Sequence, residues 1–340
     1  MQPVTSNVKN VAIPHTAHDM PSLNREGYKE HKKQEYMWLD KVRQTLDEGD
    51  LMQTKADSTS WSAFHASQHT ADARVVCPTA LLPLFLESAH TVAMIRHSMD
   101  IVSNAVFHLN PGQTPVLTFD QPLFALAKQI QWMWPDTYGE QKMVVMFGGL
   151  HIEMAALKTL GDLLHGSGWV EAIVQAEIAT PGAADAFLRA AHVTRTRRTH
   201  QITAAALFIL RRQAYDRWYD KHEGDGLDVD FEEWCNLRKQ AHPQFHYWAT
   251  VLELELLLLV YVRSLRLASF PMYLDALTEL APWFHVFDHT HYARWITIHL
   301  RDMAKLATEH PDVAAQFNAG NFTVQKNKKA ILINPYRPGT

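Results

Sequence analysis

The passage between residues 114 and 147 constrains the fold more than any other part of the sequence, because it reads as strand, helix, strand. The apolar stretch TPVLTF ends at Asp120, and a helix then begins with Pro122 in its first turn, where the missing N–H costs no hydrogen bond. A second apolar stretch, KMVVMF, ends at Gly148. Strands joined by such a crossover are normally parallel and right-handed, so both should end at the same edge of a sheet.

The segments on either side of this passage are mainly helical in pattern. Helices are predicted over 27–48 and 84–109 before it, and over 152–165, 168–178, 182–191, 199–222, 230–240, 243–268, 271–281 and 291–309 after it. Residues 331–334, ILIN, are predicted as a last strand. The fold class is therefore mostly α with a small parallel α/β core. We expect a flexible N-terminal arm, a helix with an irregular lead-in, the α/β core, a helical region and an irregular tail, over residues 1–25, 26–79, 80–167, 168–310 and 311–340.

Composition limits the cellular compartments and the kinds of partner that are expected for this chain. A net charge of -4 gives no overall attraction to nucleic acid, so any such contact needs a local basic patch. Cys77 and Cys235 lie far apart, which favours a reducing, intracellular compartment over a disulfide framework. The N-terminus lacks the apolar core of a signal peptide, and the longest apolar run, 256–262, is far shorter than the roughly 20 residues of a membrane span. We expect a nuclear or cytoplasmic protein that is neither secreted nor membrane-bound.

Three polar residues follow the predicted strands directly. Asp120 ends the first strand, and His151 and Glu153 begin the helix after the second. The carboxyl ends of parallel strands are where open α/β sheets place their sites, and a carboxylate there is suited to Mg²⁺ or Mn²⁺. In the alternative interpretation, Asp120 caps the next helix, His151 bonds to a carbonyl group and Glu153 complements the helix dipole.

The segment 189–212 is the strongest local charge feature. No acidic residue lies between Asp185 and Asp216. Within this stretch the residues that we predict to contact nucleic acid gather at a helix entry, where guanidinium groups and backbone N–H groups can grip phosphates together: Arg195, Arg197, Arg198 and His200. The alternative is that these side chains pair with acidic neighbours in space.

A second candidate site lies in WFHVFDHTHYARW, residues 283–295. If this stretch is helical, His285, Asp288 and His289 share a face and could ligate zinc or iron. The interleaved Trp, Phe and Val favour an aromatic core with hydrogen-bonded histidines instead.

Four ordered motifs carry a resemblance to a known family. TFDQPLFALAKQIQW, MFGGLHIEMAALKTLGDLLHGSGW, AHVTRTRRTHQITAAALF and WFHVFDHTHYARW with HLRDMAKLATEHPDV resemble a large uncharacterised family of near-copies in animal genomes that look like products of mobile elements. The resemblance spans roughly residues 60–326. It implies an origin in a mobile element and no particular activity.

The chain is also loosely similar to Mutator-like and hAT transposases, whose RNase H-like fold carries an Asp-Asp-Glu triad. Asp120 matches the second Asp in kind, His151 matches the histidine after the next strand, and the helices after Gly168 would correspond to the helical insertion. The similarity implies a partial RNase H-like core. Gly148 departs from the Cys or Asp usual at its position, and Asp57 is the best available first Asp.

The final carboxylate of the triad has no counterpart. Relatives continue beyond the equivalent of FTVQK into a motif with a His-Glu pair, whereas this sequence passes into AILINPYRPGT. We therefore expect a truncated or degenerate transposase-like protein that binds DNA but is inactive alone, because two-metal phosphoryl transfer lacks its full carboxylate set. The alternatives are a non-catalytic helical interaction protein, which could be a homo-oligomer, and a metal-dependent enzyme at 285–291.

Overall fold

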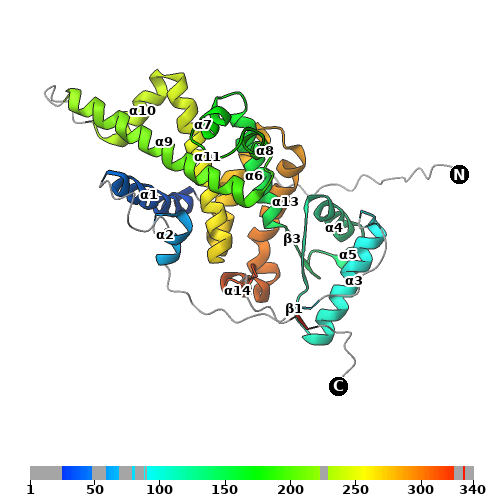
Figure 1. Cartoon of the computed structure of the whole chain (residues 1–340). Helices are drawn as coiled ribbons and strands as arrows, with labels where there is room; N and C mark the ends of the chain where they lie inside the picture. The colour runs from blue at the N-terminus through cyan, green and yellow to red at the C-terminus, as the bar shows by residue number, and fades with distance from the viewer. Residues whose placement is uncertain are drawn as a thin grey trace.

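A computed structural model describes residues 25–47, 59–68, 79–80, 88, 90–222, 229–324 and 332–333. Outside the described residues lie residues 1–24 of the arm predicted over 1–25, Asp57, Cys77, residues 325–331 and the residues after 333. The described part is mostly helical, with two small parallel sheets. Figure 1 shows the chain with the larger sheet between α4 and α6. In chain order, the first six helices of the described part are α1 (Arg25–Asp47), α2 (Trp61–Ser67), α3 (Val92–Leu109), α4 (Gln121–Met133), α5 (Pro135–Tyr138) and α6 (Gly149–Leu164).

The larger sheet confirms the predicted strand–helix–strand unit. Strand β2 (Val116–Phe119) pairs in parallel with β3 (Val144–Phe147), and Phe119 lies opposite Phe147. All four residues of β3 are buried, as expected for a short, apolar strand covered on both faces. Helix α4 is the crossover and packs against both strands.

The second sheet joins distant parts of the chain. Strand β1 (Thr79–Ala80) pairs in parallel with β4 (Leu332–Ile333). The strand predicted within 331–334 is thereby confirmed, whereas its partner was not predicted from the sequence.

The remaining helices follow the predicted order closely. They are α7 (Trp169–Gln175), α8 (Pro181–Phe187), α9 (Val193–His222), α10 (Phe231–Ala241), α11 (Pro243–Leu267), α12 (Phe270–Val286), α13 (Thr290–Glu309) and α14 (Pro311–Asn318). The tail was predicted to be irregular from residue 311, which is wrong for α14, since Pro311 sits in the first turn of a helix with buried Val313 and Phe317.

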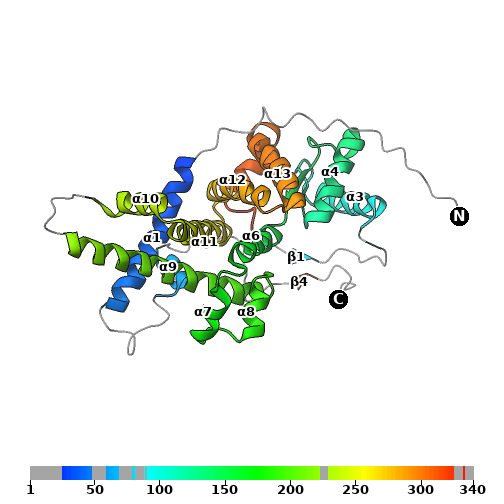
Figure 2. The same ribbon diagram turned by 90° about the horizontal axis from the view of Figure 1, so that it is seen from above.

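Helix α11 lies at the centre of the helical part. It contacts α1, α6, α9, α10 and α12, and the two views of Figures 1 and 2 both show it among these helices. Its run from Leu256 to Val262 is buried, and the helix predicted over 243–268 is confirmed. One hydrophobic core includes residues of β2, β3, α4, α9 and α11, and the predicted α/β part therefore packs together with the helical part. Within the described residues, no helix has both the length and the apolar character needed to cross a membrane.

Two further differences from the predicted pattern have local causes. Residues 61–67 were assigned to an irregular segment, yet they form α2, capped by the Ser60 side chain and anchored by buried Trp61, whose Nε1 donates to Glu35 at 2.6 Å. The helix predicted over 84–109 begins only at Val92, where Thr91 caps it. Part of the earlier stretch, residues 84–87, lies outside the described residues.

Candidate functional site

Asp120 stands where β2 gives way to α4. Its carboxylate accepts a hydrogen bond from the Leu123 N–H at 3.1 Å, so the side chain caps α4. A cap of this kind satisfies one of the free N–H groups in the first turn of a helix. Within the described residues, no group of three or more His, Cys, Asp or Glu side chains is arranged to hold a metal ion. The capping interpretation therefore describes what Asp120 does in this structure.

His151 lies at the same edge of the sheet. The Gly148 N–H donates to the Phe119 carbonyl group at 2.7 Å, which sets the end of β3 beside the end of β2. A Cβ atom on Gly148 would lie 3.0 Å from the Phe119 oxygen and 3.6 Å from the His151 ring, so glycine permits this close approach. His151 is half-buried, and its imidazole forms no hydrogen bond with the described residues. The sequence prediction that both strand ends meet at one edge is confirmed.

Tyr292 of α13 joins this edge and was not predicted. Its ring stacks on Phe147 with centroids 5.6 Å apart. Burial raises the pKa of the Tyr292 hydroxyl group, and the nearby Asp120 carboxylate raises it further. The edge therefore combines a carboxylate, an imidazole and a phenol.

Glu153 and Arg197 form a buried, two-pronged ion pair. The Arg197 Nε and Nη2 atoms donate to the two carboxylate oxygens of Glu153 at 2.6 and 2.7 Å. Side-chain exposure is 4% for Glu153 and 16% for Arg197, so both charges depend on this contact. The pair joins the N-terminal parts of α6 and α9. Glu153 is thus engaged by Arg197 and does not point freely into the site, and the Arg197 guanidinium turns toward this carboxylate.

The other members of the predicted arginine segment divide between surface and core. Arg195 and Arg198 are exposed, as a phosphate contact requires. His200 is fully buried, and its Nδ1 lies 2.8 Å from a Glu255 carboxylate oxygen. Burial raises the pKa of Glu255, and the His200 imidazole offsets this in part. The prediction that His200 contacts nucleic acid is wrong, because its helical position faces α11.

The predicted metal site at 285–291 does not form. Helix α12 ends at Val286, and Asp288 has a left-handed backbone with φ 55°. His289 precedes α13, and its Nε2 lies 3.0 Å from an Asp162 carboxylate oxygen. Because the helix ends within the motif, His285, Asp288 and His289 do not share a helix face, and the described residues contain no metal-holding group there.

An ion network at the opposite end of the sheet was missed by sequence reasoning. The Lys128 ammonium lies 2.6 Å from Glu140 and 2.8 Å from Asp302, and Arg301 contacts both carboxylates. Burial alone would raise the pKa of Glu140, but Lys128, Trp132 and Arg301 outweigh it and lower the pKa to about 2. The residues of this network come from α4, the turn before β3, and α13. Because these segments are far apart in the sequence, no local motif predicts the network.

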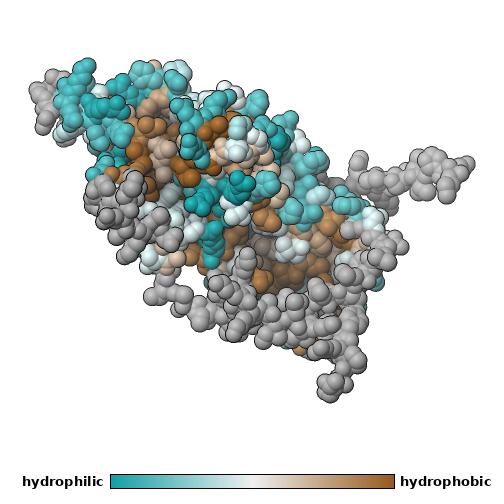
Figure 3. All heavy atoms as spheres, viewed as in Figure 1, coloured by the Kyte–Doolittle hydropathy of each residue, from teal (hydrophilic) through white to brown (hydrophobic). Residues whose placement is uncertain are grey.

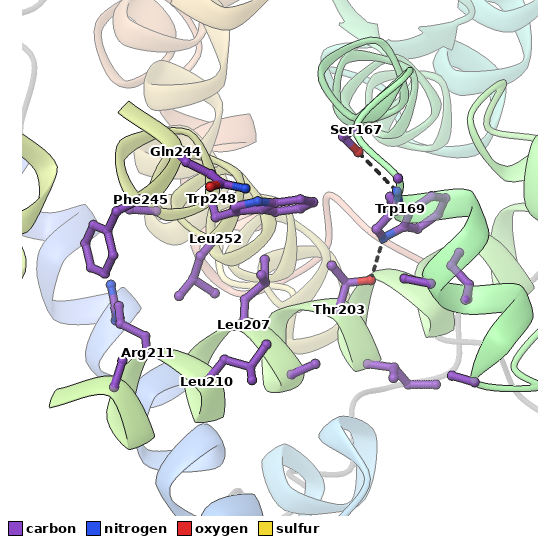
Figure 4. Close-up of a pocket in the computed structure, with 18 of the residues that line it drawn as sticks. Ser167, Trp169, Thr203, Leu207, Leu210, Arg211, Gln244, Phe245, Trp248 and Leu252 are labelled. Carbon is purple, nitrogen blue, oxygen red and sulfur yellow. Dashed lines mark hydrogen bonds between the residues drawn. The ribbon is translucent and has the colours of Figure 1, made fainter. Parts of the chain in front are cut away.

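An apolar groove of about 800 Å³ lies between α7, α9 and α11. In Figure 3, hydrophobic side chains gather on the visible face over α9 and α11. Trp169 and Ser167 lie at one end, and Arg211 lies beside Phe245 at the other, as Figure 4 shows. No candidate site was predicted here, although Arg211 belongs to the acid-free segment noted in the sequence.

The described residues form a mostly helical protein with two small parallel sheets. A family model described as "Domain of unknown function (DUF8702)" matches residues 60–222 and 211–332. Because these matches cover most of the chain, the protein belongs to that family. No curated protein and no solved structure matches the chain.

Proposed function

We propose that this protein is a non-catalytic, nucleic-acid-binding derivative of a mobile-element transposase, with a partial RNase H-like core and the helices after residue 168 as an insertion. The observation that carries the proposal is the Glu153–Arg197 ion pair. It ties the entry of α9, with Arg195 and Arg198, to α6, the helix that follows β3.

The exposed arginines support contact with phosphates. Arg195 and Arg198 stand one turn apart in the first turns of α9, and neither forms an ion pair with the described residues. A helix start presents free N–H groups and the positive end of the helix dipole. Two exposed guanidinium groups there suit a nucleic-acid backbone, and the Arg195 group lies 5.7 Å from the Phe187 ring, which leaves its N–H groups available to phosphate.

The state of the carboxylates supports the absence of catalysis. Two-metal phosphoryl transfer requires several carboxylates that converge on the ions. Asp120 caps α4, and Glu153 is held by Arg197. If Mg²⁺ or Mn²⁺ binds, Asp120 is the carboxylate that would hold it.

The experiment is a DNA-binding titration at several salt concentrations. The test variant is Arg195→Ala with Arg198→Ala, and the matched control is Arg217→Ala with Lys221→Ala, two exposed cations at the other end of α9. We expect the slope of log K against log salt to fall by about 2 in the test variant, since each lost phosphate contact contributes about 0.9. The control should retain the wild-type slope.

Two outcomes would remove the proposal. Wild-type protein without salt-dependent DNA binding removes the function itself. Equal slopes for the wild type and the test variant remove Arg195 and Arg198 from it.

The groove favours a second candidate function, that of a helical interaction protein. Leu210 and Ile202 on its wall are 58% and 40% exposed, and such patches mark interaction surfaces. Light scattering after size-exclusion chromatography, over a range of protein concentrations, tests whether a second copy covers it. A monomer at all concentrations excludes self-association.

A further inference from the structure

The groove has apolar walls from three helices. Its principal side chains are Trp169 and Ile173 on α7, Leu207 and Leu210 on α9, and Trp248 and Leu252 on α11. Figure 4 shows Trp248, Leu207 and Leu252 between the two ends. The volume of about 800 Å³ lies within the range of sites for small molecules, which combine an apolar lining with a few placed polar groups.

The shape of the groove favours an elongated occupant. On α9 its lining extends from Ile202 to Ala214, which corresponds to about 18 Å at 1.5 Å per residue. The two ends differ in chemistry. At one end the Trp169 Nε1 donates to the Thr203 hydroxyl group at 2.9 Å, so that donor is already satisfied.

At the other end the Arg211 Nε is not satisfied. The exposed fraction of Arg211 is 9%, and its buried Nε has no hydrogen-bond partner. The guanidinium carbon lies 5.2 Å from the Phe231 ring and 5.9 Å from the Phe208 ring, and these rings pack against it without supplying a counterion. No carboxylate among the described residues forms an ion pair with it, and the lining of the groove contains no Asp or Glu.

A buried cation without a counterion is unfavourable, and an anionic ligand would relieve the cost. We propose that the groove binds an organic anion with a long apolar chain, of the fatty-acid type, whose carboxylate pairs with Arg211. The alkyl chain lies along α9 between Trp248 and Leu207 toward Trp169. The planar fork of the guanidinium matches the two oxygens of a carboxylate.

The test uses dodecanoate as the probe, below the concentration at which it self-associates, with isothermal titration calorimetry as the readout. Dodecan-1-ol retains the chain without the charge, and acetate retains the charge without the chain. The variants are Arg211→Gln, Arg211→Lys and Ala206→Trp, which places a large ring at an exposed position of the groove. Arg217→Gln is the matched control on the same helix, outside the groove.

We expect dodecanoate to bind the wild type and the Arg217→Gln control equally. Arg211→Gln should weaken binding by about 10- to 100-fold, the usual worth of a hydrogen bond to a charged group. Arg211→Lys should recover part of this loss, and Ala206→Trp should abolish binding. Dodecan-1-ol should bind the wild type more weakly than dodecanoate by a similar factor, and acetate should not bind.

The proposal is overturned if the wild type does not bind dodecanoate, or if dodecan-1-ol binds as tightly. These two comparisons need no variant, so a folding defect in Arg211→Gln cannot rescue the idea. Unchanged affinity in a folded Arg211→Gln protein also overturns it. A wild-type dimer that Ala206→Trp dissociates would assign the groove to a second copy instead.

Discussion

Buried charged side chains have counterions around the larger sheet, whereas in the groove between α7, α9 and α11 a buried charge has none among the described residues. Around the sheet, Glu153 is paired with Arg197, and Glu140 with Lys128 and Arg301. In the groove, Arg211 has no such partner among the described residues. A predicted site residue such as Glu153 therefore stabilises the fold. The more promising place for a ligand is the groove, where a buried cation lacks a counterion.

The largest effect is expected from breaking the Glu153–Arg197 pair. Glu153→Gln leaves the Arg197 guanidinium without its counterion in a buried place and should lower the free energy of unfolding by about 3 kcal/mol. Urea unfolding at pH 7 measures this, with the exposed Glu171→Gln as the control. A loss below 1 kcal/mol would mean that the carboxylate is not needed for structure and is free for another role.

A smaller and pH-dependent effect is expected at the opposite end of the sheet. The folded pKa of Glu140, about 2, lies below its ordinary value of 4.5, so its stabilisation is present above pH 4.5 and is lost as pH falls toward 2. After allowance for partial exposure, Glu140→Gln should cost about 2 kcal/mol at pH 7.

Unfolding of the wild type and Glu140→Gln at pH 7, 5, 4 and 3 tests this expectation. The difference in unfolding free energy should shrink below pH 4.5. A difference that stays constant down to pH 3 would show that Glu140 is not the titrating group.

Asp120 offers a test of capping against metal binding. Asp120→Ala should lower the unfolding free energy by about 1 kcal/mol, and Asp120→Asn by less than 0.5 kcal/mol, because asparagine also caps helices well. Thermal denaturation with and without Mg²⁺ measures both. Stabilisation of the wild type by Mg²⁺ that Asp120→Asn abolishes would give Asp120 a metal role in addition to the cap.

The smallest effect on stability is expected in the groove. Ala206 is exposed, so Ala206→Trp should change the unfolding free energy by less than about 0.5 kcal/mol. Thermal denaturation measures this change. A large loss of stability would show that Ala206 is buried in solution and that the groove is closed. The groove would then offer no space for a ligand, and its difference from the sheet region would disappear.

Local pattern was enough to predict the elements that carry the sheet edge. The two apolar runs before Asp120 and Gly148 predicted β2 and β3, and their crossover predicted that they are parallel. The helical pattern over 199–222 predicted α9, which begins six residues earlier, at Val193. These features depend on neighbours in sequence, which is why the sequence reveals them.

Features that depend on distant segments were missed or mistaken. The spacing of His285 and His289 suggested a shared helix face, but the left-handed Asp288 ends that face without a Gly or Pro signal. His200 was assigned to the surface because its partner, Glu255, lies on another helix. The groove likewise requires three helices to come together, and no single stretch of sequence describes it.

Helix α9 contributes a residue to each candidate region, the Glu153–Arg197 pair and the groove. Arg197 near its start belongs to the pair, and Arg211 in the same unbroken helix belongs to the groove, about 21 Å away at 1.5 Å per residue. A continuous helix transmits displacement along its axis as a stiff rod. An occupant that pulls on Arg211 therefore also bears on the Glu153 contact, and amide exchange along the whole of α9 should slow together when the groove is filled.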